Sequence, residues 1–202
     1  MLLMSKWNGR CKVIYDLVDQ YDPILRQPTQ SFDFENIPSI RRKGTMFPLD
    51  PEQLAADLKE TMIHCKGAGL AAPQVGIPYS VCVVGHHSQP DEIMTLFNPR
   101  IVDFSGEEYY SEEGCLTFPG LFIKVKRHMN IRLRCQLENG VTDTITLDGW
   151  AARVVQHEVD HLNGILYQDR ATRYHLDQGR KQKVKLDRMR KKNGTATRQA
   201  VA

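Results

Sequence analysis

The clearest periodic pattern in the chain begins after Asp50. Apolar side chains recur there at the spacing of one helix face: Leu54, Leu58 and Met62. Asp50 can cap the first turn, Pro51 suits the first helical position, and Gly67 can end the helix. This pattern predicts a helix over residues 51–65.

Later in the chain, short apolar or alternating runs predict β-strands. They are residues 81–84, 95–97, 101–104, 123–126, 131–134 and 144–147. Several alternate apolar and polar side chains, as half-buried antiparallel strands do. A second helix is predicted over residues 149–162, with Asp148 as its cap and Gly164 near its end. These elements predict one α+β domain, with antiparallel strands wrapped around a central helix.

Residues 10–49 carry no comparable pattern. Four residues in this segment precede a proline, which disfavours helix: Asp22, Gln27, Ile37 and Phe47. We expect an irregular arm with short extended pieces. The basic run at residues 39–44 is interpreted as a solvated loop.

The second predicted helix contains the sequence QHEVDH, residues 156–161. At ~3.6 residues per turn, His157 and His161 face the same side of the helix and can bind one metal ion. Glu158 points about 100° away, beside such an ion, where it can accept a proton from water. A pair of histidines at this spacing also arises by chance on solvated helices, but the intervening glutamate favours a hydrolytic metal site. A third ligand would strengthen this interpretation.

Two other stretches have the features of a site. Residues 67–74, GAGLAAPQ, combine small side chains that let the backbone approach a ligand with the amide of Gln74, although a tight turn would use the same residues. Residues 113–117, EGCLT, place Cys115 beside a glycine. This cysteine can be the third ligand, or an inert thiol of the core.

The composition of the 202-residue chain argues against some classes of protein. Five cysteines without a CxxC pair suit a reducing compartment better than a disulfide framework. No stretch approaches the ~20 apolar residues of a membrane span, and the apolar residues 1–4 are too few for a signal-peptide core. We expect a cytoplasmic protein without membrane contact, while a short organellar presequence stays open.

Charge is unevenly distributed along the chain. Residues 170–202 hold eleven Lys and Arg against two Asp, a net charge of +9 in a chain of +3 overall, so residues 1–169 carry −6. We therefore divide the chain into a catalytic domain, residues 1–169, and a basic helical appendage, residues 170–202. Gly179 is expected to interrupt that helix, and the residues after Asn193 are expected to be disordered.

In this order, GAGLAAPQ, EGCLT and QHEVDH resemble the three motifs of peptide deformylases, and the similarity covers most of the chain. Members of that family are α+β metallohydrolases that remove the N-formyl group from N-formylmethionyl nascent polypeptides and release formate. The resemblance implies that Cys115, His157 and His161 hold one divalent ion. It implies Fe(II) as the native ion, with Ni, Co or Zn as substitutes; the ligand set alone would equally suit zinc.

The resemblance also implies the roles of the residues around the metal. Glu158 would act as general base towards a metal-bound water and could then protonate the departing amine. The side-chain amide of Gln74 and the backbone N–H of Leu116 would stabilise the oxygen of the tetrahedral intermediate. Two departures are visible: Thr117 stands where the family usually has serine, and residues 37–49 form a longer segment than usual.

Helical spacing indicates where the substrate side chain binds. Trp150 and Val154 lie on the same stripe of the predicted helix as His157. With Gly69 they are candidates for the wall that receives a methionine side chain, although Trp150 could also be plain core. Asp160 is expected to support the site by pairing with Arg127.

Two alternatives remain. An HExxH metallopeptidase would usually take its third ligand downstream of the helix, whereas Cys115 lies upstream. A non-catalytic protein associated with the ribosome or RNA would not need Glu158 and Gln74, and both are present. Residues 181–192 resemble the helix with which some deformylases dock on the ribosome, and a basic tail could contact RNA or simply confer solubility. We expect a monomer.

Overall fold

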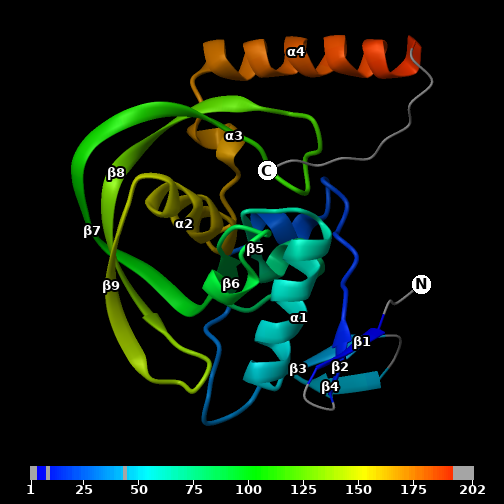
Figure 1. Cartoon of the computed structure of the whole chain (residues 1–202), viewed down its shortest axis with the longest axis vertical. Helices are drawn as coiled ribbons and strands as arrows, with labels where there is room; N and C mark the ends of the chain where they lie inside the picture. The colour runs from blue at the N-terminus through cyan, green and yellow to red at the C-terminus, as the bar shows by residue number, and fades with distance from the viewer. Residues whose placement is uncertain (1–3, 8–9, 43–44, 193–202) are drawn as a thin grey trace.

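The computed structural model describes residues 4–7, 10–42 and 45–192 and has the α+β architecture that the sequence predicts. A five-stranded antiparallel sheet of order β5-β6-β7-β8-β9 curves around the helix α2 (Figure 1). Its strands are β5 (Gly69–Ala71), β6 (Val81–Val84), β7 (Met94–Glu113), β8 (Ile123–Gln136) and β9 (Thr142–Asp148). In the described part of the chain, no helix has both the length and the apolar character that crossing a membrane requires.

Strands β7 and β8 are much longer than the sequence predicts. Residues 95–97 and 101–104 belong to one strand, and the next two predicted strands belong to another. The predicted break falls at Asn98, whose φ is 49°, and at Pro99, which has no N–H to donate. The hydrogen-bonded pairing of β7 with β8 continues past this break, with a register shift between Phe97 and Arg100. Residues 102–108 are all exposed, so the alternation that marks a strand is missing there.

The helix α2 (Gly149–Leu162) lies inside the curve of the sheet and has the predicted bounds. Asp148 stands at the N-cap position, but its side chain makes no capping hydrogen bond, so the predicted side-chain cap is wrong. Its apolar side chains pack against the inner face of the sheet, where they form one cluster with Leu96 and Leu133. The helix residues of this cluster are Ala152, Val155, Val159 and Leu162. The polar residues of α2 from Gln156 to Asp160 are buried as well, so protein also covers the part of the helix that does not face the apolar cluster. Burial of so many polar groups requires partners for each, and these partners form the site described below.

The helix α1 (Pro51–His64) follows the pattern that predicted it. The Asp50 side chain accepts a hydrogen bond of 2.8 Å from the backbone N–H of Gln53, which satisfies one free donor of the first turn. Leu54, Leu58 and Met62 are at most 2% exposed and pack against β5 and β6. Each fully buried side chain of this size stabilises the fold by roughly 1.5–3 kcal/mol.

The N-terminal arm contains more regular structure than expected. Within it, β3 (Ser39–Arg42) pairs with β4 (Thr45–Pro48), and β2 (Arg10–Val13) at its start pairs with β1 (Met4–Trp7), which precedes the arm. The basic run is not the expected loop, because residues 39–42 form a strand; residues 43–44 lie outside the described part of the chain. Ile40 is buried in the main core, which explains why this strand is held in place. The remaining short elements are η1 (Pro23–Arg26), η2 (Ala72–Val75), η3 (Pro90–Glu92) and α3 (Tyr167–Arg170).

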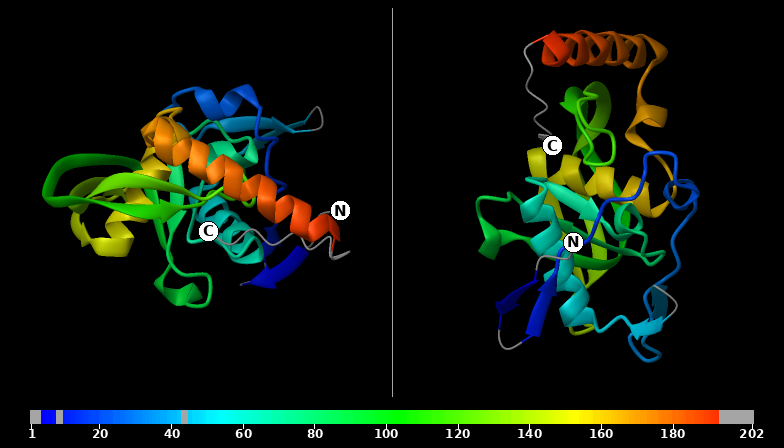
Figure 2. Two further views of the ribbon diagram at one scale, coloured as in Figure 1. Left: turned by 90° about the horizontal axis from the view of Figure 1, so that it is seen from above. Right: turned by 90° about the vertical axis from the view of Figure 1, so that its right-hand side faces the viewer.

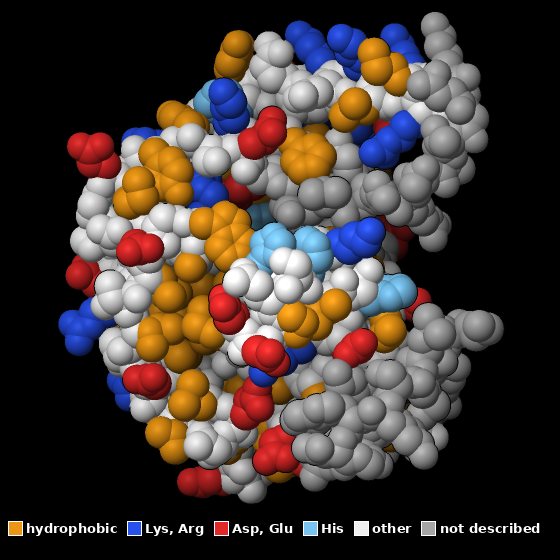
Figure 3. All heavy atoms as spheres, in the orientation of Figure 1, with side chains coloured by type: hydrophobic (Ala, Val, Ile, Leu, Met, Phe, Trp, Pro, Cys, Tyr) orange, Lys and Arg blue, Asp and Glu red, His pale blue; other side chains and the backbone are white. Residues whose placement is uncertain are grey.

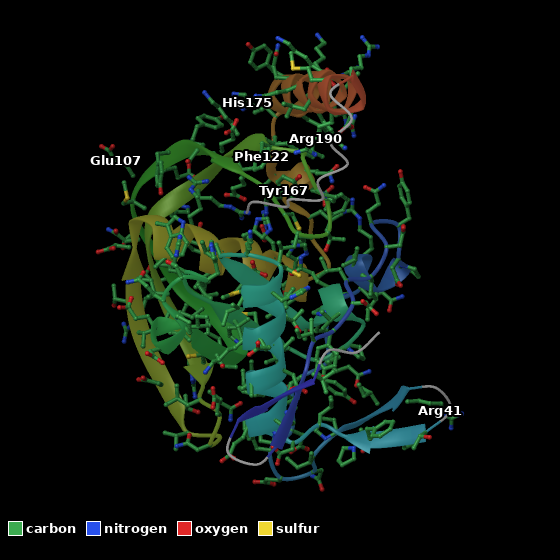
Figure 4. The ribbon with its side chains drawn as sticks, turned by 45° about the vertical axis from the view of Figure 1, so that its right-hand side comes forward. Arg41, Glu107, Phe122, Tyr167, His175 and Arg190 are labelled. Atoms are coloured by element: carbon green, nitrogen blue, oxygen red, sulfur yellow. The ribbon has the colours of Figure 1, made fainter. Side chains whose placement is uncertain are left out.

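The helix α4 (Arg173–Lys192) passes through Gly179 without interruption, so the predicted break is wrong. It lies across the outer side of the hairpin formed by β7 and β8 (Figure 2). A Cβ at Gly179 would stand 2.4 Å from the carbonyl oxygen of Phe122, so this glycine allows the close approach. Figure 4 shows Phe122 beneath α4 and near Tyr167, whose hydroxyl donates a 2.8 Å hydrogen bond to the carbonyl of Leu121. The residues after Asn193 lie outside the described part of the chain.

The packing at Gly179 gives a test of how α4 is held. On an isolated helix, Gly→Ala is stabilising by about 1 kcal/mol. Here Gly179→Ala is expected to be destabilising and to loosen α4, because the new methyl group would collide with backbone at Phe122. Urea unfolding and hydrogen exchange of the α4 amides would measure this effect, with Gln182→Ala on the exposed face as the control. Slower exchange in Gly179→Ala than in the unmodified protein would contradict it.

Candidate metal centre

Three buried side chains converge at the inner end of the curved sheet. The ligand atoms of Cys115, His157 and His161 all lie within 4.8 Å of one another. His157 and His161 come from successive turns of α2, with ring centroids 5.0 Å apart. Cys115 comes from residues 114–122, which connect β7 to β8 and are here called the 114–122 loop; its Sγ is 3.3 Å from His161 Nε2. The structure thus assembles the three residues proposed as ligands from sequence.

The surroundings of these side chains suit a cation. His157 donates its Nδ1 hydrogen to Glu113 Oε2 at 3.0 Å, which leaves Nε2 available as a ligand. Burial lowers the pKa of His157, but its hydrogen bonds to Cys115 and Glu113 outweigh burial and raise the pKa to about 10. The anionic neighbours therefore attract a positive charge at this position, which a metal ion can supply instead of a proton. One thiolate and two imidazoles are also a donor set that divalent transition metals prefer.

Glu158 lies beside the three ligand residues and is not one of them. Its carboxyl is buried, and Oε2 has no hydrogen-bond partner within the described part of the chain. Burial raises its pKa to about 7, against an opposing effect of His157. A Cβ at Gly69 would stand 2.4 Å from Glu158 Oε1, so Gly69 is the residue that leaves room for this carboxyl. A side chain with a pKa near neutrality can both accept and return a proton.

Gln74 brings a side-chain amide to the same point. Its Oε1 accepts a 2.8 Å hydrogen bond from the backbone N–H of Ala71, which fixes the orientation of the amide. Its Nε2 then donates to Thr117 Oγ1 at 3.1 Å and to Cys115 Sγ at 3.5 Å. Thr117 therefore supplies the hydroxyl that a serine would supply at this position. Leu116, next to Cys115, is buried beneath Gly67.

A pocket of about 130 Å³ opens beside Glu158 and His157. Its wall includes all three residues proposed for the substrate side chain, Gly69, Trp150 and Val154. Trp150 is 50% exposed, so it forms the mouth of the pocket and is not plain core. Its ring lies 6.4 Å from that of His86, and Figure 3 shows histidine side chains gathered at the centre of this face. Ala68 of the GAGLAAPQ stretch also lines the pocket, as do Ser111 and Arg153, which the sequence did not single out.

A cluster of five charged residues, four of them buried, lies behind His157; we call it the charge cluster. Its members are Glu113, Arg127, Arg153, Asp160 and Arg170. Arg127 pairs with Asp160 at 2.5 Å, as expected from sequence, and also donates to both oxygens of Glu113 at 3.0 Å. Burial opposes ionisation of Glu113, but the hydrogen bonds from His157 and Arg127 lower its pKa to about 2. Removing one partner from such a buried set typically costs ~3–5 kcal/mol, because an unpaired charge remains.

Sequence reasoning missed two residues of this cluster that act on His157. Glu113 stands inside the EGCLT stretch, in which only the cysteine was a candidate ligand. Arg153 lies one turn before His157 on α2, where a charged side chain is usually solvated. A signal for Arg153 was available: in the predicted helix it falls on the same side as His157 and His161, the two predicted metal ligands.

Sequence comparisons match this chain to one family of known proteins. The family model described as polypeptide deformylase matches residues 14–176. The peptide deformylase of Dictyoglomus thermophilum is 48% identical over 120 residues, 59% of this chain and 76% of that protein. The peptide deformylase of Aquifex aeolicus is 35% identical over 161 residues, 78% of this chain and 88% of that protein.

Solved structures give the same result. A plant peptide deformylase matches with a TM-score of 0.73 and 30% identity, covering 92% of this chain and 96% of that chain. A peptide deformylase from Synechococcus elongatus in complex with actinonin matches with a TM-score of 0.70 and 33% identity, covering 84% and 86%.

Proposed function

The chain belongs to the polypeptide deformylase family, and we propose that Cys115, His157 and His161 form its metal centre, with Glu158 as the general base. As a peptide deformylase, it removes the N-formyl group from nascent polypeptides. The observation that supports the site assignment is the convergence of three buried ligand atoms beside a buried carboxyl and a pocket. Membership of this family does not favour the alternative function, that of an HExxH metallopeptidase.

The proposed mechanism uses the geometry around Glu158. When bound, a divalent metal ion supplies a Lewis acid and lowers the pKa of water. Glu158 accepts the proton of the water that attacks the formyl carbon, and the same carboxyl then protonates the departing amine. Its burial supports this role, because a carboxyl held out of bulk water keeps a pKa near neutrality.

Gln74 and Leu116 are proposed to stabilise the transition state. The Gln74 amide is held in one orientation by Ala71, with its Nε2 3.1 Å from Thr117 Oγ1 and 3.5 Å from Cys115 Sγ, beside the proposed metal position. The backbone N–H of Leu116 follows the cysteine directly. Two fixed donors near the reacting carbonyl oxygen would stabilise the negative charge that develops on it, and loss of one such donor commonly costs ~3 kcal/mol.

The pocket is proposed to bind the methionine side chain of the substrate. Gly69, Trp150 and Val154 supply a small, an aromatic and an aliphatic surface, and the pocket adjoins Glu158. A methionine side chain is flexible and apolar and suits such a wall. The formyl group would then lie against the carboxyl that acts on it.

From the family resemblance we infer Fe(II) as the native metal, with Ni, Co or Zn as substitutes; a thiolate and two imidazoles suit all four ions and do not by themselves select iron. The function is tested by anaerobic formate release from a formyl-methionyl tripeptide, followed with the metal-loaded protein. Formate release at a rate that scales with metal content would support the assignment. Cleavage of an internal peptide bond in an unformylated peptide, without formate release, would favour a peptidase.

The helix α4 is proposed to contact ribosomal RNA. Figure 3 shows Lys and Arg side chains along the edge of the molecule that α4 forms, whereas acidic side chains predominate over the opposite half of this face. Residues 170–202 carry +9 on a body of −6, so electrostatic attraction to phosphate would be concentrated there. We predict that the enzyme is a monomer and that it is located in the cytoplasm, and both properties would suit a contact with ribosomes.

Two variants test the proposed interaction with RNA. A chain truncated after Thr172 is expected to deformylate a free tripeptide nearly normally but to lose salt-sensitive cosedimentation with ribosomes. The combined variant Lys181→Gln, Lys185→Gln and Arg188→Gln keeps α4 in place, since these side chains are exposed. For this variant, the fall of log affinity with log salt concentration should become less steep, by roughly 0.7–0.9 for each phosphate that the helix no longer neutralises.

The matched control removes three exposed charges from the sheet instead: Arg100, Arg132 and Arg134. Ribosome binding that falls equally in the control and in the α4 variant would assign no specific role to the helix.

A further inference from the structure

Arg153 uses nearly every hydrogen-bond donor of its guanidinium inside the protein. Nη1 donates to Glu113 Oε1 at 2.7 Å and to the carbonyl of Val125 at 3.0 Å, Nη2 donates to the carbonyl of Tyr109 at 2.8 Å, and Nε donates to the Tyr109 hydroxyl at 3.5 Å. The guanidinium also lies over the Tyr109 ring, with Cζ 4.4 Å from the ring centroid. The residue is only 6% exposed. A buried arginine bonded to α2, β7 and β8 at once fixes the positions of these elements relative to one another.

The contact with Glu113 connects Arg153 to the metal centre. Glu113 Oε2 accepts from His157 Nδ1 and Arg127 Nη2, and Glu113 Oε1 accepts from Arg127 Nε and Arg153 Nη1. Arg127 also donates to Asp160, and this second hydrogen bond restricts how far Arg127 could move together with Glu113. Arg153 approaches the same carboxylate from α2, the helix that carries His157. It therefore holds Glu113 in a fixed position relative to the imidazole that Glu113 orients.

We propose that Arg153 is a positioning residue of the deformylation reaction. It keeps Glu113 against His157 Nδ1, so that the other ring nitrogen of His157 stays aimed at the metal position. This inference rests on the proposed function, because it assumes that His157 is a metal ligand. It differs from a purely structural role, in which Arg153 would only tie α2 to the sheet, and from a role as pocket wall, in which its aliphatic part would only contact the substrate.

The three roles predict different results for Arg153→Met, which keeps an unbranched side chain but removes every donor. If Arg153 positions His157, Co(II) affinity measured by chelator competition without substrate should fall by on the order of tenfold, since loss of an outer partner of a metal ligand costs ~10–100-fold. The visible absorption bands of bound Co(II) should shift, and kcat with saturating Co(II) should fall. Arg153→Lys, which can still donate to Glu113, should recover part of both losses.

Arg134→Met is the matched control, because Arg134 is an exposed arginine of β8 and its loss changes the net charge equally. It should leave Co(II) affinity, the spectrum and kcat unchanged. If Arg153→Met lowers only the urea midpoint, Arg153 is structural, and if it raises only KM, Arg153 is pocket wall. Either result overturns the proposal.

A second variant keeps the test decisive if Arg153→Met does not fold. Tyr109→Leu removes the ring beneath the guanidinium, but the carbonyl of residue 109 still accepts from Arg153. It should weaken Co(II) binding severalfold and shift the same absorption bands, and unchanged values would refute the proposal. Since Co(II) affinity is measured without substrate, this outcome is distinct from failure of the proposed function, which would appear as absence of formate release in the unmodified protein.

Discussion

Glu158→Gln is expected to abolish most deformylation while the protein keeps its metal. Glu158 is not among the three ligand residues, and glutamine has nearly the same shape, so it fits the space that Gly69 leaves. The amide cannot accept a proton from water, and general acid–base catalysis typically contributes ~10²–10⁴-fold. We expect kcat to fall by at least this amount with metal content near one ion per chain. Formate release and metal analysis of the same sample would measure both.

Glu107→Gln is the control for this variant. Glu107 is an exposed residue of β7 and lies on the outer side of the molecule, away from the pocket (Figure 4). Its replacement removes the same charge and should leave kcat unchanged. If Glu158→Gln kept a rate near that of the unmodified protein, another group would have to be the base.

Cys115→Ser is expected to have an effect of similar size by a different route. A serine hydroxyl stays protonated near neutral pH and is a much poorer ligand than a thiolate. Metal affinity should therefore fall by more than the ~10–100-fold that loss of an outer partner costs, and turnover should collapse with it. Metal retained after gel filtration and the sulfur-to-Co(II) absorption in the near ultraviolet would report the loss directly.

The matched control is Cys65→Ser, because Cys65 is a half-buried cysteine at the end of α1, far along the chain from the 114–122 loop. It should retain both metal and absorption. If Cys115→Ser instead bound metal with unchanged affinity, the third ligand would have to be a residue other than Cys115.

The sequence predicted those elements whose signals are local. The helix α1 combines a side-chain cap with an apolar stripe, and α2 has an apolar stripe, although the Asp148 side chain makes no capping hydrogen bond; these local features need no distant partner to be recognised. The continuity of β7 was not predictable in this way, since Asn98 and Pro99 end the local pattern and only pairing with β8 carries the strand across them. The hairpin of β3 and β4 was missed because its four-residue strands are short, with Pro38 directly before β3 and Pro48 as the last residue of β4.

The site was predictable to the extent that its residues have a chemistry of their own. Cysteine, histidine and glutamate at these spacings indicate a hydrolytic metal site, and the three motifs together identified the family. The role of Arg153 depends on carbonyl groups of β7 and β8, to which no sequence spacing points. The prediction at Gly179 failed for the same reason, since its helix-breaking tendency is a local property and the backbone of Phe122 lies far away in sequence.

The origin of the three ligand residues in two separate segments has a thermodynamic consequence. Two histidines come from α2 and the cysteine from the 114–122 loop, so the complete set exists only when the loop is packed against the helix. A metal ion bound there acts as a cross-link, and its binding free energy adds to that of folding. An ion at about 1,000 times its dissociation constant would raise the free energy of unfolding by ~4 kcal/mol. The melting temperature of this enzyme should therefore report metal occupancy, and chelation should make the same chain markedly easier to unfold.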